Sequence, residues 1–309
     1  MNKENVMKAE GIIVPLLTPV NEDESINNDA LERLINYVIE GGVNAIFVMG
    51  SSGEFARFDT DFRFQTIRAA VEIVNGRVPV YAGVSDCGTK RVLRHVENAE
   101  KAKADAVVVT LPYYFPIRND DEAYQHFSLV AANTAIPVVL YNIPGTCGAA
   151  ISLSVLDRLQ EYKNIVGIKD SSGNKDYLGE LLSRYHNSDF GVIAGAEELS
   201  YEALTQGAVG LVPSLANPFP KLFSKLFRSA KQKDFQMMQK LCEKIDEINR
   251  LNQFCNAWMA PNVWRKKALE MMGICPGNMT KPYVPVDKGA INKIQEFIDW
   301  YQSEPGLEK

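Results

Sequence analysis

The feature that most limits what this chain can fold into is a regular alternation of short apolar runs and amphipathic stretches. The apolar runs occupy residues 11–17, 43–49, 78–84, 105–111, 136–141, 165–169, 190–194 and 208–212. Each is followed by a stretch with apolar residues at helical spacing, as in residues 60–74, 89–103 and 197–206. The runs lack the alternation of a half-exposed strand, which indicates parallel strands covered on both faces.

Eight strand–helix units within residues 1–230 predict an α/β fold, the (β/α)8 TIM barrel, which typically takes roughly 250 residues. The alternative is a doubly wound sheet. No Gly-x-Gly-x-x-Gly motif follows the first run, and eight units exceed the usual number for that fold, so we favour the barrel. Three further helical stretches, residues 234–254, 259–272 and 288–303, form a C-terminal extension. We predict a barrel over residues 1–230 and, over residues 231–309, helices packed on the barrel or on a neighbouring subunit.

Composition excludes several classes of protein. The net charge of −5 implies no broad basic surface for nucleic acid. No apolar run approaches the roughly 20 residues of a membrane span, and the first ten residues lack the apolar core of a signal peptide. The five cysteines are widely spaced, without zinc-ligand spacing, which indicates reduced thiols. We predict a cytoplasmic protein with no metal, no cofactor and no membrane or nucleic-acid partner.

Polar residues at the carboxyl ends of the apolar runs are the candidates for chemistry, because reactive groups lie there in a barrel. Lys169 ends the sixth run. Burying an ammonium is costly and favours the free amine, the form that attacks a ketone. The alternative is a lysine that reaches solvent from a strand end. Tyr141 ends the fifth run and is either a proton-transferring phenol or a core aromatic with a satisfied hydroxyl.

Other strand ends carry weaker signals. The segment Gly50-Ser51-Ser52-Gly53-Glu54 is either a flexible turn or a nest of N–H groups and hydroxyls for a carboxylate. Glu197 and Glu198 either begin a helix or bind substrate hydroxyls. The remaining candidates at strand ends are Tyr114, Gly195 and Ser214. The histidines lie inside predicted helices and are assigned no chemistry: His95, His126 and His186.

Taken together, these motifs resemble one family, the dihydrodipicolinate synthase/N-acetylneuraminate lyase superfamily. The resemblance covers nearly the whole chain, with each motif in the expected order. It rests on five segments: Pro15-Leu16-Leu17-Thr18-Pro19, Gly50-Ser51-Ser52-Gly53-Glu54, Tyr113-Tyr114, Tyr141-Asn142-Ile143-Pro144-Gly145 and Gly167-Ile168-Lys169-Asp170.

The resemblance implies a class I aldolase or lyase on a barrel, assembled as a homotetramer that is a dimer of dimers. Lys169 would form the imine with pyruvate or another 2-oxo acid, and Tyr141 would relay protons. Ser51 and Ser52 would hold the carboxylate, and Tyr114 would enter the neighbouring subunit's site. Further substrate contacts would come from Gly195, Glu197, Glu198 and Ser214.

The choice within the superfamily depends on Thr146, which stands where the synthases of this superfamily usually carry an arginine. Asp170-Ser171-Ser172-Gly173 also departs from the synthase pattern. The chain is more similar to 2-keto-3-deoxy-sugar-acid aldolases at Pro112-Tyr113-Tyr114-Phe115-Pro116 and Lys169-Asp170. We therefore predict cleavage or condensation of a 2-keto-3-deoxy sugar acid, giving pyruvate and an aldehyde. The alternatives are 4-hydroxy-tetrahydrodipicolinate synthase, N-acetylneuraminate lyase and a sugar acid dehydratase.

Overall fold

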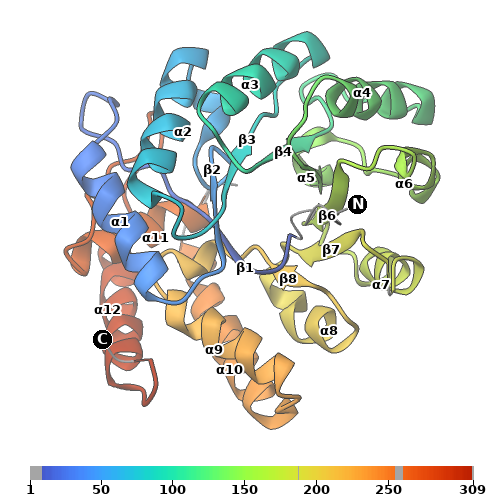
Figure 1. Cartoon of the computed structure of the whole chain (residues 1–309). Helices are drawn as coiled ribbons and strands as arrows, with labels where there is room; N and C mark the ends of the chain where they lie inside the picture. Colours follow the sequence, from blue (N-terminus) through green and yellow to red (C-terminus); the bar gives the residue numbers. More distant parts are fainter. Residues whose placement is uncertain (1–8, 187, 255–259, 308–309) are drawn as a thin grey trace. The chain divides into compact units, whose positions relative to one another are not determined.

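The computed structural model describes residues 9–186, 188–254 and 260–307 (Figure 1). Within them, parallel strands pair in chain order and form a closed barrel, so the predicted TIM barrel is confirmed and the doubly wound sheet is excluded. The strands are β1 (Gly11–Pro15), β2 (Ala45–Val48), β3 (Val80–Gly83), β4 (Ala106–Thr110), β5 (Val138–Asn142), β6 (Ile165–Asp170), β7 (Gly191–Ala194) and β8 (Gly210–Leu211).

A helix follows each strand, as the sequence predicts. The helices between strands are α1 (Asn28–Glu40), α2 (Thr60–Val74), α3 (Thr89–Lys101), α4 (Asp120–Ala132), α5 (Pro144–Cys147), α6 (Leu153–Leu159), α7 (Lys175–Arg184) and α8 (Ser200–Thr205). Short 3-10 turns η1 (Phe55–Arg57), η2 (Glu197–Leu199) and η3 (Ser214–Ala216) follow β2, β7 and β8. The predicted helix over residues 197–206 is therefore two shorter elements, because the turn at η2 comes before α8.

The C-terminal helices are α9 (Pro220–Lys231), α10 (Phe235–Asn249), α11 (Ala260–Met271) and α12 (Lys288–Ser303), with η4 (Arg250–Phe254) after α10. The predicted helix over residues 234–254 thus ends as a 3-10 turn. The predicted start of the next helix at Met259 lies outside the described residues. The predicted domain boundary after residue 230 stays a prediction.

The chain divides into two compact units. One holds Pro79–Val212 and the segment that ends at Gly11, and the other holds Ile12–Val78 and the segment that begins at Pro213. In the first unit, α3, α4, α6, α7 and α8 surround β3–β8 (Figure 1). In the second unit, α10 packs along α9, and α12 packs on α11.

The strands are buried along almost their whole length, which explains their unbroken apolar composition. Helix starts follow from capping side chains. Asn27 accepts a hydrogen bond from the Ala30 N–H at the start of α1, and Asp59 accepts one from the Phe62 N–H at the start of α2. These caps end the loops that follow β1 and β2 at defined residues.

Candidate active site

The register between β5 and β6 decides which side chains meet at their carboxyl ends. Tyr141 pairs with Lys169, and Asn142 pairs with Asp170. Successive residues of a strand point to opposite faces of the sheet. Tyr141 and Lys169 therefore share one face, and Asn142 and Asp170 share the other.

The Tyr141 and Lys169 side chains are in direct contact. Lys169 is 5% exposed, Tyr141 is 4% exposed, and Nζ of Lys169 lies 3.8 Å from the centroid of the Tyr141 ring. A lysine ammonium this close to an aromatic face is attracted to the ring's negative quadrupole. The structure thus brings together the predicted imine-forming lysine and the predicted proton-transferring phenol.

Asn142 and Asp170 hold the two strand ends together on the other face. Nδ2 of Asn142 donates to Oδ1 of Asp170 at 2.7 Å, and the Ser172 hydroxyl donates to Oδ2 at 2.9 Å. Burial raises the pKa of the Asp170 carboxyl above its ordinary value, although these hydrogen bonds oppose the shift. Oδ1 of Asn142 accepts from the Ile151 N–H at 2.9 Å. This network fixes the backbone that carries Tyr141 and Lys169.

Gly195, which follows β7, makes room for the lysine. Its N–H donates to the Asp170 carbonyl at 2.7 Å. A Cβ at this position would lie 2.6 Å from Cε of Lys169 and 2.1 Å from Oγ of Ser171. Any larger residue would displace one or both side chains, so the close approach requires glycine.

The acidic pair after β7 and the tyrosine after β4 occupy different surroundings. Glu197 and Glu198 begin η2. The Glu198 carboxylate lies beside Gly173, because a Cβ added to Gly173 would be 3.4 Å from Oε1 of Glu198. Tyr114 is 80% exposed, has a φ of 79° and packs edge-on against the Phe115 ring at 4.9 Å. A left-handed backbone is strained for an aromatic residue.

In the second unit, the Gly50–Glu54 loop follows β2. The Ser52 hydroxyl donates to the Ser214 hydroxyl at 3.0 Å, so the structure joins two of the predicted substrate-binding serines. The Thr18 hydroxyl donates to the Gly53 carbonyl at 2.8 Å. A Cβ on Gly53 would lie 3.2 Å from the Leu16 carbonyl and the Met49 nitrogen, so the loop packs tightly on the backbone beside it.

Sequence reasoning missed a polar cluster after β3. The buried Asp86 accepts hydrogen bonds from Nε of Arg91 at 2.7 Å and from the Cys87 N–H at 2.7 Å, and its Oδ2 lies 3.0 Å from Nε2 of His95. Burial opposes ionisation of Asp86, but these hydrogen bonds outweigh it and hold its pKa at about 2. An aspartate two residues after the end of the third apolar run was the available signal.

His126, also set aside because it lies in a helix, reaches back to the end of β4. Its Nε2 lies 3.1 Å from the Thr110 carbonyl, so this nitrogen donates, and Nδ1 accepts from the Thr89 hydroxyl at 2.9 Å. Burial lowers the pKa of His126 to about 4. The ring is therefore a neutral structural link between β4 and α3.

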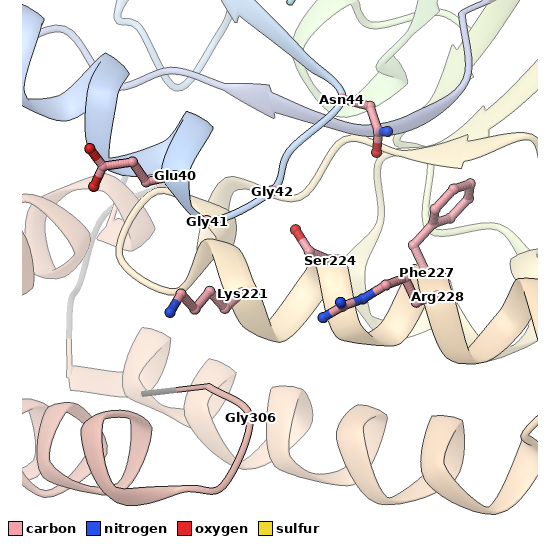
Figure 2. A pocket seen from close by; sticks show the side chains of 9 residues that line it. All are labelled: Glu40, Gly41, Gly42, Asn44, Lys221, Ser224, Phe227, Arg228 and Gly306. Atoms are coloured by element: carbon pink, nitrogen blue, oxygen red, sulfur yellow. The ribbon is translucent and has the colours of Figure 1, made fainter. Parts of the chain in front are cut away.

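The cavity in Figure 2, about 490 Å³ in volume, belongs to a different place in the fold. It lies beside Gly41, Gly42 and Asn44, which precede β2, and side chains of α9 such as Arg228 line it from the opposite side. The cavity is thus at the amino end of β2, and none of the candidate site residues lines it.

Within the part of the chain that the structure describes, no group of three or more His, Cys, Asp or Glu side chains is placed to hold a metal ion. None of the helices there is both long enough and apolar enough to span a membrane.

Comparison with known proteins gives a consistent result. Residues 8–300 match the model of the Dihydrodipicolinate synthetase family. The 4-hydroxy-tetrahydrodipicolinate synthase of Phocaeicola vulgatus is 32% identical over 294 residues, which are 94% of this chain and 97% of that protein.

Solved structures agree in fold over the same extent. Dihydrodipicolinate synthase from Aquifex aeolicus has a TM-score of 0.88 and 28% identity, and the match covers 95% of this chain and 98% of that one. The enzyme from Acinetobacter baumannii, solved in complex with pyruvate, has a TM-score of 0.86 and 29% identity over 94% of this chain and 98% of that one. The chain therefore belongs to the dihydrodipicolinate synthetase family and is an enzyme of the class I, Schiff-base-forming lyases.

Proposed function

We propose that Lys169 forms a Schiff base with pyruvate and that Tyr141 transfers protons during the reaction. The observation that carries this proposal is the contact between the two side chains, with Nζ 3.8 Å from the ring centroid and both residues buried. The pyruvate bound by the relative from Acinetobacter baumannii supports the choice of oxo acid.

The chemistry follows from an amine and a phenol held together. The Lys169 amine attacks C2 of pyruvate, and the carbonyl oxygen leaves as water to give the protonated imine. The imine is an electron sink, so loss of a proton from C3 gives an enamine. C3 of the enamine attacks an aldehyde carbon, and the new alkoxide takes a proton. Tyr141 is the proposed group that carries these protons.

The remaining predicted contacts are proposals that rest on the resemblance. Ser51 and Ser52 would bind the pyruvate carboxylate through hydroxyls and backbone N–H groups. Glu197, Glu198 and Ser214 would contact the second substrate. Tyr114 would complete the site of a neighbouring subunit in a homotetramer, and its 80% exposure is what such a contact requires.

The names of the relatives favour the synthase over the sugar acid aldolase that the motifs predict. We therefore propose, first, condensation of pyruvate with aspartate semialdehyde, the reaction of a 4-hydroxy-tetrahydrodipicolinate synthase. Relatives of this name match at 32% and 34% identity over 94% of the chain.

One observation keeps the aldolase as the second candidate. Thr146 is an exposed residue of α5, at the position where the synthases that this chain resembles usually carry an arginine. A threonine hydroxyl cannot form the bidentate ion pair that an arginine makes with a carboxylate. An aldehyde that lacks this carboxylate, such as one released from a 2-keto-3-deoxy sugar acid, would not need that arginine.

Borohydride trapping tests the imine. Reduction in the presence of pyruvate should add the mass of the reduced pyruvate adduct to the peptide that contains Lys169. Reduction without pyruvate, or of the Lys169→Ala variant with pyruvate, should add none. Absence of an adduct in the wild-type protein would refute the proposed chemistry.

A substrate panel then separates the two candidates. Pyruvate consumption with aspartate semialdehyde is compared with pyruvate release from 2-keto-3-deoxygluconate and from sialic acid. The synthase proposal expects the highest kcat/KM with aspartate semialdehyde. A kcat/KM that is highest for the sugar acid would overturn it in favour of the aldolase.

A further inference from the structure

The loop that follows β2 is held by two residues of the C-terminal segment. Nδ2 of Asn262 donates to the Ser52 carbonyl at 3.0 Å, and Nζ of Lys266 donates to Oε1 of Glu54 at 2.7 Å. Asn262 and Lys266 are four residues apart in α11 and thus lie on one face of that helix. One helical face therefore contacts the loop at two successive points.

The contact with Glu54 is a buried ion pair that further hydrogen bonds support on both sides. Lys266 is 0% exposed and Glu54 is 4% exposed. Nζ of Lys266 also donates to the Asn278 carbonyl at 2.8 Å. Oε2 of Glu54 accepts from the Thr280 hydroxyl at 2.5 Å and from its N–H at 3.2 Å. Removing one partner of such a pair leaves an uncompensated buried charge, which is far more costly than removing both.

The backbone of the loop needs support of this kind. Met49 and Glu54, which flank Gly50 to Gly53, have φ values of 55° and 60°. A left-handed conformation is unfavourable for side chains of this size and persists only where the surroundings fix it. Lys266 bonds to the strained Glu54 itself, and Asn262 bonds to Ser52, which lies between Met49 and Glu54.

We infer that Asn262 and Lys266 are positioning residues, which hold the Gly50–Glu54 loop so that Ser51 and Ser52 face a bound carboxylate. This inference rests on the proposed function, since that proposal assigns the carboxylate to Ser51 and Ser52. It extends the substrate-binding machinery to α11, in the C-terminal extension for which the sequence predicts only helices packed on the barrel or a neighbouring subunit. A purely structural role of α11 predicts instead that these residues affect stability but not affinity for pyruvate.

The discriminating variant is Asn262→Ala, with Asn252→Ala as its matched control. Asn252 accepts a hydrogen bond from Nε1 of Trp264, also in α11, at 2.8 Å, and this bond does not involve the Gly50–Glu54 loop. Both variants remove one asparagine hydrogen bond that anchors α11, but only Asn262→Ala frees the Ser52 carbonyl. The readouts are the pyruvate concentration that gives half-maximal borohydride trapping, the trapping rate at saturation, and the melting temperature.

For Asn262→Ala we expect half-saturation to rise about tenfold, the effect of losing one buried hydrogen bond in the bound state. The saturated trapping rate should stay within about twofold, because Lys169 and Tyr141 are untouched. Asn252→Ala should lower the melting temperature to a similar degree and leave half-saturation unchanged. Equal half-saturation in Asn262→Ala and wild type, or an equal rise in both variants, would overturn the inference.

The ion pair gives a second test, which can be read even if the single variant does not fold. Lys266→Met alone leaves Glu54 charged and buried, so we expect a large loss of stability. The double variant Glu54→Gln with Lys266→Met should recover stability but keep a raised half-saturation, because the loop has lost its ionic tie to α11. A double variant with wild-type half-saturation would contradict the positioning role. If the wild-type protein itself forms no adduct, the proposed function is refuted, and this inference is refuted with it.

Discussion

Replacing Gly195 by alanine should displace the reactive amine and leave the fold intact. The added Cβ would lie 2.6 Å from Cε of Lys169, whereas ordinary contact begins at 3.4 Å. Cε must therefore move by about 0.8 Å, and Oγ of Ser171 must rotate away as well. Cε lies near the end of a flexible side chain, and Oγ moves by rotation about one bond. The third neighbour, the Asp170 carbonyl oxygen, would lie 3.3 Å away and needs only a slight shift, so the folded state can accommodate the change at small cost.

The expected effect on activity is large. A misplacement of about 1 Å at a reacting group costs roughly 100-fold in rate. Gly195→Ala should slow borohydride-trapped imine formation by about that factor and leave the far-ultraviolet circular dichroism spectrum unchanged. Gly195 is not among the residues with positive φ, so the variant adds no backbone strain.

Gly179→Ala is the matched control in the same unit. Gly179 lies in α7, where the nearest atom to an added Cβ is Oε1 of Gln206 at 3.8 Å, an ordinary contact distance. This variant should keep wild-type trapping and gain slightly in stability from the higher helix propensity of alanine. If Gly195→Ala traps pyruvate as fast as Gly179→Ala, the space beside Lys169 does not position the amine.

Three further variants test other parts of the site. Tyr141→Phe keeps the ring beside the amine but removes the hydroxyl, so turnover should fall about 100-fold while the trapped adduct persists; an equal loss of both would exclude the proton relay. His126→Gln should flatten the pH dependence of stability. Burial depresses the pKa of His126 from 6.5 to about 4, so its stabilisation is full above pH 6.5 and is lost as the pH falls toward 4. Between pH 7 and pH 5 this loss is about 2 kcal/mol in urea unfolding, and an unchanged slope in the variant would contradict it. Tyr114→Ala should leave the stability of the subunit fold within about 0.5 kcal/mol, because the side chain is 80% exposed, but should weaken assembly in sedimentation velocity. Unchanged sedimentation would argue against the proposed contact between subunits.

The sequence predicts the fold well where local signals agree. Residues 60–74 are predicted as a helix and form α2 with the same bounds, because Asp59 caps its start and Asn75, with a φ of 48°, ends it. Residues 208–212 are predicted as a strand, but β8 spans only Gly210–Leu211. The apolar pattern marks which residues are buried, whereas strand length depends on pairing with neighbours that are distant in sequence.

Contacts over long sequence separation could not be predicted in the same way. Glu54 and Lys266 are 212 residues apart, and Lys266 lies between Arg265 and Lys267 in a run of three cations. Nothing local distinguishes the lysine that is fully buried from Lys267, which is half-buried and paired with Glu270. Asn262 lies four residues before Lys266 on the same helical face, which hints at a polar contact along that face. The sequence does not show which segment that face contacts.

The register between β5 and β6 decides whether the predicted lysine and the predicted tyrosine meet. Each residue of interest is the neighbour of another: Tyr141 precedes Asn142, and Lys169 precedes Asp170. Because adjacent residues face opposite sides of a strand, a slip of one residue in either strand would separate Tyr141 from Lys169 and Asn142 from Asp170 at the same time. The 2.7 Å hydrogen bond between Asn142 and Asp170 on one face therefore favours the register that places the amine against the phenol ring on the other. Lys169 and Tyr141 supply the reactive groups, and Asn142 and Asp170 supply the strand alignment without which those groups would not meet.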